Sequence, residues 1–179
     1  MNRNDRCMST LVQQNINMAP TRVELELTEQ CNLTCSFCYN SQKPVVSGIS
    51  ERIINRLVDE GVLEIVLTGG EPMLHPRFEE LLKLCCANFA KVMVQTNGTY
   101  ITKEWAKMFS KIGVYGVNIS LHGPERIHEE LTKAEGSFDK AFAGLKNIVY
   151  ESRDVNVASN FVLTKRCKYS STVYQRQLL

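Results

Sequence analysis

Short apolar segments alternate along the chain with amphipathic segments of helical spacing. Residues 23–28 alternate apolar and polar side chains, and residues 62–68 are almost continuously apolar; both patterns are typical of strands. The predicted strands are residues 23–28, 62–68, 92–96, 114–121 and 155–163. Apolar residues three and four positions apart predict intervening helices, which begin at or just after Ser50, Pro76, Thr102 and Ser137. A further helix is predicted to begin after Thr164.

This order of elements predicts the α/β fold class. Strands that alternate with helices at this spacing form βα units, whose strands lie parallel in one sheet. We expect a curved parallel sheet of βα repeats with about five strands, which is a partial, incomplete TIM-like barrel. Residues 21–179 are expected to form this core domain. Residues 1–20 are polar and rich in Asn and Gln, and are expected to be a poorly ordered N-terminal segment.

The charge balance narrows the classes of partner. The 179 residues carry 21 basic and 19 acidic side chains, a net charge of +2, which gives no support for binding to nucleic acid or to a membrane surface. No apolar run reaches the ~20 residues that span a bilayer, and the N-terminal segment lacks the apolar region of a secretory signal. We therefore expect a cytoplasmic protein, in which clustered cysteines hold metal rather than form disulfides.

Polar motifs follow four of the predicted strands. They are Cys31–Cys38 after the first strand, Gly69–Pro72 after the second, Asn97 after the third and Ser120–His122 at the end of the fourth. In parallel α/β folds the functional residues lie on loops at the carboxyl ends of the strands. We therefore expect the four motifs to share one face of the sheet.

Three cysteines, Cys31, Cys35 and Cys38, lie within eight residues. The spacing differs from the paired ligands of a zinc finger and from the four thiolates of a ferredoxin. Soft thiolates with no nearby histidine favour an iron–sulfur cluster over zinc. Three protein ligands would leave a metal position open for a cofactor or substrate. A zinc knuckle or a merely reduced thiol cluster remains the alternative at this point.

These motifs together resemble those of radical S-adenosylmethionine (SAM) enzymes. Cys31–Cys38 resembles the cysteine signature of that family, and Gly69–Pro72 its glycine–glycine–glutamate–proline motif. Thr96–Gly98 and Ile119–Pro124 resemble the ends of its third and fourth strands. The resemblance extends over about residues 21–165, and it is greatest to peptide-modifying members.

The resemblance implies two cofactors, a [4Fe-4S] cluster and SAM. Cys31, Cys35 and Cys38 would hold the cluster, and SAM would bind its fourth iron through the amino and carboxylate groups of the methionine moiety. One electron from the reduced cluster would cleave SAM, and the resulting 5′-deoxyadenosyl radical would abstract a hydrogen atom from the substrate. The cofactors would supply the reactive chemistry, and the protein would bind and orient them.

The resemblance also implies a set of SAM-binding residues: Gly69, Gly70, Glu71, Ser120, Phe37, Tyr39 and Asn97. The two glycines would let the backbone approach the ligand closely, and the Glu71 carboxylate would bind the ammonium group of SAM. Ser120 would contact the carboxylate or ribose. Phe37 and Tyr39 would lie beside the adenine.

Several of these residues also have structural explanations. Gly69–Pro72 is a plain strand-to-helix turn in its composition, and Asn97-Gly98 is a common turn sequence. Ser120 could cap a turn. Asn160, on the fifth predicted strand, is a further candidate for the SAM site. His122 is expected to be a structural loop residue, and His75 and His128 are expected on solvated surfaces.

The chain departs from the family pattern in three places. The common core of the family has six strands, whereas five are predicted here, so the last βα unit is expected to be absent. Thr132, followed by Lys133, stands where related sequences often carry an arginine that holds the SAM carboxylate. No cysteine-rich extension for further clusters follows Cys167.

The sequence therefore predicts a radical SAM, oxidoreductase-like enzyme. Its expected partners are a peptide or protein substrate and a flavodoxin- or ferredoxin-like electron donor. The alternative is a truncated or non-catalytic domain of the same fold, which binds the cluster, and SAM with it, as a metal-binding or interaction module.

Overall fold

The fold was analysed in a computed structural model of the chain, which describes residues 20–39 and 51–163. Three sequence predictions lie outside the described residues: the N-terminal segment before residue 20, the helix cap at Ser50 and the helix after Thr164.

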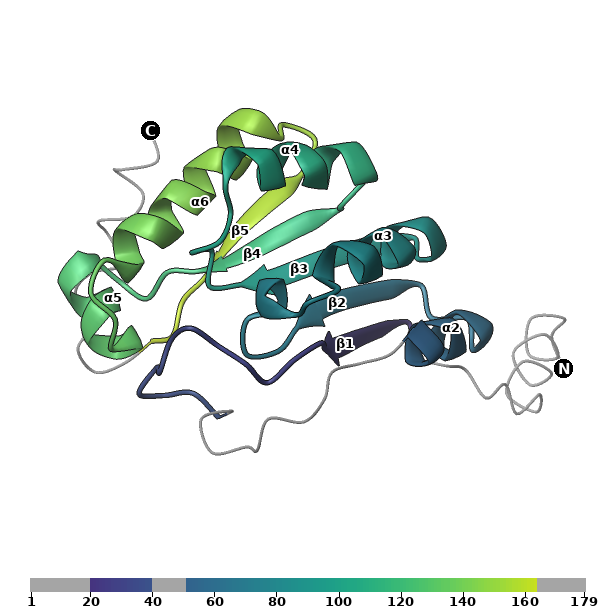
Figure 1. The fold of residues 1–179 in the computed structure, drawn as a ribbon, viewed down its shortest axis with the longest axis horizontal. Helices are drawn as coiled ribbons and strands as arrows, with labels where there is room; N and C mark the ends of the chain where they lie inside the picture. Colours follow the sequence, from purple (N-terminus) through teal and green to yellow (C-terminus); the bar gives the residue numbers. More distant parts are fainter. Residues whose placement is uncertain (1–19, 40–50, 164–179) are drawn as a thin grey trace, which may run out of the picture.

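Five parallel strands form one open sheet, as the sequence predicts. Their order in the sheet is the order in the chain (Figure 1). The strands are β1 (Arg22–Glu26), β2 (Glu64–Thr68), β3 (Lys91–Thr96), β4 (Gly116–Ser120) and β5 (Asn156–Asn160). The register places Leu25 beside Leu67 and Leu67 beside Val94, so apolar side chains align across the sheet and face one core.

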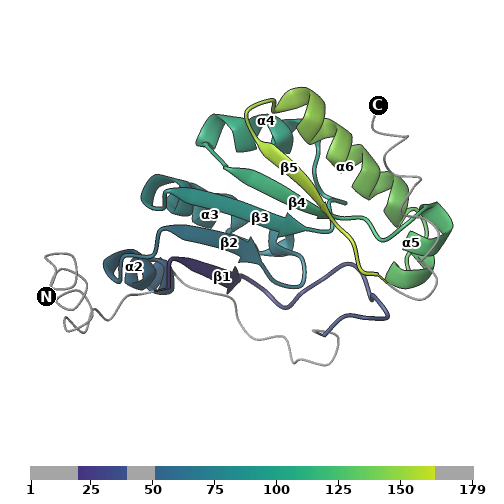
Figure 2. The same ribbon diagram turned by 180° about the vertical axis from the view of Figure 1, so that it is seen from behind.

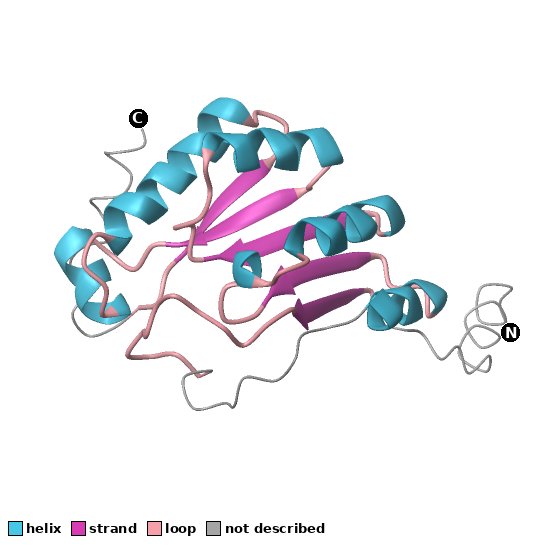
Figure 3. Cartoon of the chain, in the orientation of Figure 1, coloured by secondary structure: helices cyan, strands magenta, loops and turns pink. Residues whose placement is uncertain are grey.

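Helices cover one face of the sheet (Figure 1). The view from behind shows the opposite face, which these helices do not cover (Figure 2). The helices are α2 (Glu51–Asp59), η1 (Pro72–Leu74), α3 (Phe78–Asn88), α4 (Lys103–Ile112), α5 (Glu125–Thr132) and α6 (Ser137–Glu151). The short helices η1 and α5 were not among the predicted elements. Each joins the carboxyl end of a strand to a longer helix (Figure 3), so both lie at the face where the polar motifs gather.

Local sequence signals place the helix ends. Thr102 caps α4, because its hydroxyl accepts a hydrogen bond from the Trp105 amide at 3.3 Å. Gly113 ends the same helix with a φ of 81°, a left-handed conformation that glycine adopts without strain. These caps fix where the chain turns back to the sheet and therefore where β4 begins.

The core lies between the sheet and its helices. Ile65, Leu67, Val94, Val117 and Ile119 are fully buried there. The strand β5 differs, because all five of its residues are exposed. It forms one edge of the sheet.

Candidate cofactor site at the carboxyl edge of the sheet

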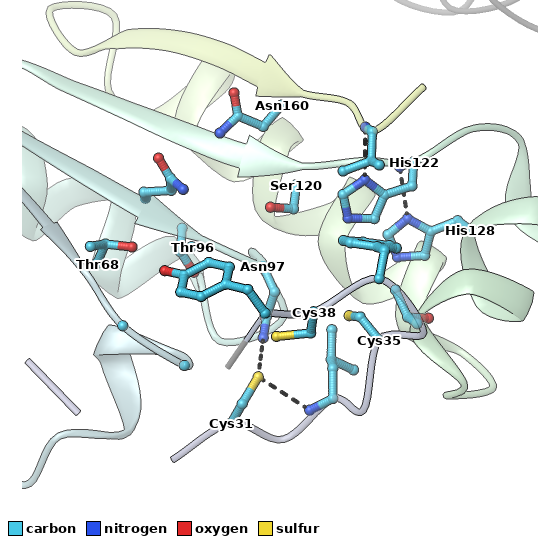
Figure 4. A pocket seen from close by; sticks show the side chains of 18 of the residues that line it. Cys31, Cys35, Cys38, Thr68, Thr96, Asn97, Ser120, His122, His128 and Asn160 are labelled. Atoms are coloured by element: carbon cyan, nitrogen blue, oxygen red, sulfur yellow. Dashed lines mark hydrogen bonds between the residues drawn. The ribbon is translucent and has the colours of Figure 1, made fainter. Parts of the chain in front are cut away.

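One cavity of about 460 Å³ lies at the carboxyl ends of the strands. Its volume is within the range of small-molecule sites. Loops after β1, β2, β3, β4 and β5 all contribute to its lining (Figure 4). The four polar motifs therefore share one face of the sheet, as predicted.

Nine of the ten predicted site residues line this cavity. They are Cys31, Cys35, Cys38, Gly69, Gly70, Phe37, Tyr39, Asn97 and Ser120. Asn160 also lines it. Glu71 does not, since its side chain is completely buried beside the cavity.

The cysteine loop is held by the last turn of α5. The Ser36 amide donates a hydrogen bond to the Leu131 carbonyl at 2.8 Å, and the Thr34 amide donates to the Thr132 carbonyl at 3.3 Å. The last carbonyls of a helix have no partner within it, so the loop satisfies them. The loop and the α5–α6 corner are thereby fixed relative to each other.

Burial raises the pKa of two of the three thiols, Cys31 and Cys35, when no metal is bound. Burial, with a smaller contribution from the Cys31 and Cys38 sulfurs, raises the pKa of the Cys35 thiol to about 11. Burial also raises the pKa of Cys31, although a hydrogen bond from the Leu33 backbone acts in the opposite direction. Such thiols are poor nucleophiles, and metal binding would displace their protons.

The three thiols are candidate ligands of one metal ion or of a cluster. Within residues 20–39 and 51–163, no three His, Cys, Asp or Glu side chains are placed to hold a single metal ion. In a cubane cluster each thiolate binds a different iron, so this finding does not count against a cluster. Three sulfurs on the wall of one cavity, beside open space, fit a cluster that keeps one iron accessible.

Gly69 and Gly70 are required by packing against the chain that leads into the cysteine loop. A Cβ atom at Gly69 would lie 2.3 Å from the Thr28 carbonyl oxygen, and one at Gly70 would lie 2.3 Å from the Gln30 carbonyl oxygen. The Gly70 amide donates to Thr28 at 2.7 Å. The two glycines therefore bring the turn after β2 into backbone contact with the segment after β1. Close approach to a ligand, as predicted from the sequence, stays a prediction.

The Glu71 carboxylate binds protein groups in the described structure. It accepts hydrogen bonds from the Thr96 hydroxyl at 2.7 Å, the Asn97 amide at 2.8 Å and the Met73 amide at 3.2 Å. Burial raises the pKa of Glu71, while these hydrogen bonds act to lower it. The carboxylate joins η1 to the end of β3. The predicted bond between Glu71 and the SAM ammonium group stays a prediction.

The Phe37 and Tyr39 side chains come from the cysteine loop. The Phe37 ring meets the His122 ring edge to face, with centroids 4.7 Å apart. The Tyr39 hydroxyl donates to Glu26 at 2.9 Å, and burial together with this carboxylate raises the pKa of Tyr39 to about 12. The two aromatic residues give the cavity an apolar wall, which is the kind of surface that stacks against a purine.

The prediction that His128 lies on a solvated surface is wrong. Its side chain is only 1% exposed, stacks on His122 with centroids 5.6 Å apart and lines the cavity. The His128 Nδ1 atom accepts a hydrogen bond from the His122 amide at 3.1 Å. Burial lowers the pKa of each histidine to about 4, so both rings are neutral at pH 7. His75 is partly exposed.

Sequence reasoning missed His128 because α5 was not predicted. The buried residues of α5 are His128, Leu131 and Thr132, which have the three- and four-residue spacing of one helix face. That spacing was the available signal. Thr132 lines the cavity at the position where related sequences often carry arginine, and its hydroxyl is bonded to that of Ser137 at 2.8 Å. No Lys or Arg is among the described residues that line the cavity.

A family model described as the radical SAM superfamily matches residues 25–164. This chain belongs to the radical SAM superfamily. Members of the superfamily use a [4Fe-4S] cluster and SAM as cofactors, in agreement with the two cofactors predicted from the sequence. No helix in the described part of the chain is long and apolar enough to cross a membrane.

Two curated relatives are maturation proteins by name. The sporulation killing factor maturation protein SkfB of Bacillus subtilis (strain 168) is 32% identical over 161 residues, 87% of this chain and 39% of SkfB. The mycofactocin maturase MftC of Mycobacterium tuberculosis (strain CDC 1551 / Oshkosh) is 33% identical over 153 residues, 83% of this chain and 39% of MftC. The chain thus spans about two fifths of their length.

Solved structures have the same fold. Streptococcus suis SuiB bound to S-adenosylmethionine matches with a TM-score of 0.75 at 23% identity, over 98% of this chain and 41% of SuiB. The anSMEcpe enzyme bound to AdoMet and a peptide matches with a TM-score of 0.73 at 23% identity, over 86% of this chain and 47% of that chain. The predicted partial TIM-like barrel is therefore confirmed.

Proposed function

We propose that this chain is the cluster- and SAM-binding core of a radical SAM enzyme that modifies a peptide or protein. The observation that carries the proposal is the single cavity shared by Cys31, Cys35 and Cys38, the Gly69–Gly70 turn and Ser120. Three thiols and a vacant volume beside them suit a cluster with one open iron. The polar groups on the opposite wall suit the ligand that would complete it.

Different residues of the cavity would hold the two cofactors. Cys31, Cys35 and Cys38 would bind the cluster as thiolates. Ser120 would donate a hydrogen bond to the carboxylate or ribose of SAM, and Phe37 with Tyr39 would cover its adenine. When bound, the reduced cluster would supply the electron that cleaves SAM to the 5′-deoxyadenosyl radical, which abstracts hydrogen from the substrate.

Neutral donors would hold the SAM carboxylate, because no Lys or Arg is among the described lining residues. Ser120, Gln95 and Asn160 are lining residues with neutral side chains that can donate hydrogen bonds. Such donors bind a carboxylate less strongly than the bidentate fork of an arginine. The proposal therefore includes a lower SAM affinity than a site with arginine at position 132 would have.

A peptide substrate is supported by the relatives rather than by the cavity. SkfB and MftC are named as a maturation protein and a maturase, and SuiB has been solved with its precursor peptide SuiA. We extend this substrate class to the present chain. The electron would come from a flavodoxin- or ferredoxin-like protein.

The experiment that tests this function is SAM cleavage by the anaerobically reconstituted chain. Dithionite and SAM are added, and 5′-deoxyadenosine is measured by chromatography. We expect its formation to depend on both additions. A protein with a full cluster that binds SAM without producing 5′-deoxyadenosine would contradict catalysis by this chain and would favour the non-catalytic domain.

A further inference from the structure

The Asn97 side chain connects the end of β3 to the cysteine loop. Its Oδ1 atom accepts hydrogen bonds from the Thr99 amide at 3.0 Å and the Thr99 hydroxyl at 2.7 Å. A backbone amide can only donate, so the amide oxygen of Asn97 must face Thr99. The NH₂ group is therefore directed to the opposite side, toward the cysteine loop.

Both hydrogens of this NH₂ group have an acceptor in the loop. The Asn97 Nδ2 atom lies 2.8 Å from Asn32 Oδ1. It also lies 3.9 Å from Cys31 Sγ (Figure 4). The Leu33 amide is a second donor to Cys31 Sγ, at 3.4 Å. The Cys31 sulfur is thus approached by two N–H groups from different elements, one from its own loop and one from the end of β3.

The cysteine loop also donates a hydrogen bond to the loop after β3. The Asn32 amide nitrogen donates to the Thr99 hydroxyl at 3.0 Å. Asn32, Asn97 and Thr99 therefore form a closed set of hydrogen bonds between the loop after β1 and the loop after β3. The Asn97 backbone amide is fixed separately by Glu71 Oε2 at 2.8 Å. Hydrogen bonds to Glu71, Asn32 and Thr99 therefore fix the position of Asn97.

We propose that Asn97 is a positioning residue that raises the reduction potential of a cluster bound through Cys31. The inference rests on the proposed function, since it requires that cluster. A hydrogen bond to a ligating sulfur stabilises negative charge there, and the reduced cluster is the more negative form. No Lys or Arg is among the described residues that line the cavity, and the Cys31 sulfur accepts hydrogen bonds from the N–H groups of Leu33 and Asn97.

Glu71 would affect the Cys31 sulfur indirectly, by fixing the backbone of Asn97. Its two carboxylate oxygens hold the Thr96 hydroxyl and the Asn97 amide, and the Thr96 hydroxyl in turn accepts from the Gly98 amide at 3.0 Å. The glutamate of the turn after β2 therefore fixes the backbone from which the sulfur donor projects. Through Asn97, two hydrogen bonds connect the Glu71 carboxylate to the Cys31 sulfur.

The test compares Asn97→Asp and Asn97→Ala with wild type. Aspartate has the same shape and keeps the acceptor for Thr99, but it loses the NH₂ donors. Asn147→Asp is the matched control, because Asn147 donates to the Ile101 carbonyl at 2.8 Å away from the cavity. Iron and sulfide are counted first, and the midpoint potential is then measured without SAM by titration followed with electron paramagnetic resonance.

We expect the midpoint to shift to more negative potential in Asn97→Asp, and by a smaller amount in Asn97→Ala. The Asn147→Asp protein should keep the wild-type midpoint. Full clusters with an unchanged midpoint in both Asn97 variants would overturn this inference and leave the proposed function standing. A wild-type protein that accepts no cluster would overturn the proposed function itself. If Asn97→Asp loses its cluster, the midpoint potential of Asn97→Ala tests the inference alone. A shift to more negative potential supports it, and an unchanged midpoint overturns it.

Discussion

The Glu71 carboxylate and the Asn97 backbone amide are joined by a buried hydrogen bond of 2.8 Å. It connects the turn after β2 to the end of β3, two motifs that are 26 residues apart in the sequence. The same carboxylate accepts two further hydrogen bonds. Glu71 thus holds the turn after β2 and the end of β3 together behind the residues that line the cavity.

Replacing Glu71 tests this structural role. In Glu71→Ala the donors of Thr96, Asn97 and Met73 lose their shared acceptor, and buried donors without partners are costly. We expect the free energy of unfolding of the metal-free protein to fall by roughly 3 kcal/mol, measured by urea denaturation. Exposed Glu79 serves as the control position, where the same substitution should cost less than about 0.5 kcal/mol. Equal losses at both positions would contradict the role of Glu71.

Gly70→Ala tests the contact between the turn after β2 and the segment after β1. The added methyl group would lie 2.3 Å from the Gln30 carbonyl oxygen, and backbone on both sides prevents easy relief. We expect a loss of roughly 3 kcal/mol in the free energy of unfolding. Gly61→Ala is the matched control: Gly61 has a φ of +80° with no atom within 4 Å, so it should cost only about 1 kcal/mol of backbone strain. A smaller loss for Gly70→Ala than for Gly61→Ala would argue against the packing constraint.

His128 gives the metal-free protein an acid-sensitive stability. Its pKa in the folded protein is about 4, below the ordinary 6.5, so the unfolded chain binds the proton more readily. The stability that neutral His128 contributes is complete above pH 6.5 and is lost as the pH falls toward 4. This loss is on the order of 3 kcal/mol.

His128→Asn should remove the part of the pH dependence that His128 contributes, while the part from His122, whose pKa is also lowered to about 4, remains. The asparagine oxygen can accept the His122 amide in place of Nδ1, whereas the side chain does not titrate. Urea unfolding at pH 7 and pH 4.5 measures the effect. His75→Asn is the control, because His75 Nδ1 also accepts a backbone amide, from Arg77 at 3.1 Å, but its side chain is partly exposed. If His75→Asn reduced the pH dependence as strongly as His128→Asn, the assignment to His128 would be wrong.

Ser120→Ala tests the wall opposite the cysteines. The variant should keep its cluster and bind SAM roughly tenfold more weakly, which corresponds to one lost hydrogen bond of about 1–1.5 kcal/mol. Equilibrium dialysis of the reconstituted protein measures the dissociation constant. Ser110→Ala changes a serine that is bonded to Asp154 outside the cavity and should leave SAM binding unaltered. Unchanged SAM affinity in Ser120→Ala would remove Ser120 from the binding site.

The sheet and the cysteine triad could be predicted from sequence because both are local patterns. Apolar runs such as residues 62–68 predict strands on their own, and the cysteine spacing lies within one loop. The carboxyl-edge rule then placed Asn97 and Ser120 beside the cysteines without knowledge of any contact.

The roles of Glu71 and Gly70 could not be predicted, because they depend on contacts between segments that are distant in the sequence. The partners of Glu71 lie on the next strand, and the reason for Gly70 is the backbone near Gln30. Neither follows from residue type. The burial of His128 could have been predicted, since its spacing with Leu131 is helical. The helix is short and follows a Pro124 turn, however, and its only other buried side chain, Thr132, is polar.

The central claim is that Cys31, Cys35 and Cys38 hold a [4Fe-4S] cluster in the cavity they line. Iron and acid-labile sulfide, counted per chain after anaerobic reconstitution, test it most directly in wild type, Cys35→Ala and Cys86→Ala. Cys86 lies on α3 outside the cavity and controls for loss of a thiol. We predict about four irons and four sulfides in wild type and Cys86→Ala, and no stable cluster in Cys35→Ala. A wild-type protein that binds zinc and accepts no cluster, or a Cys35→Ala protein with a full cluster, would contradict the claim.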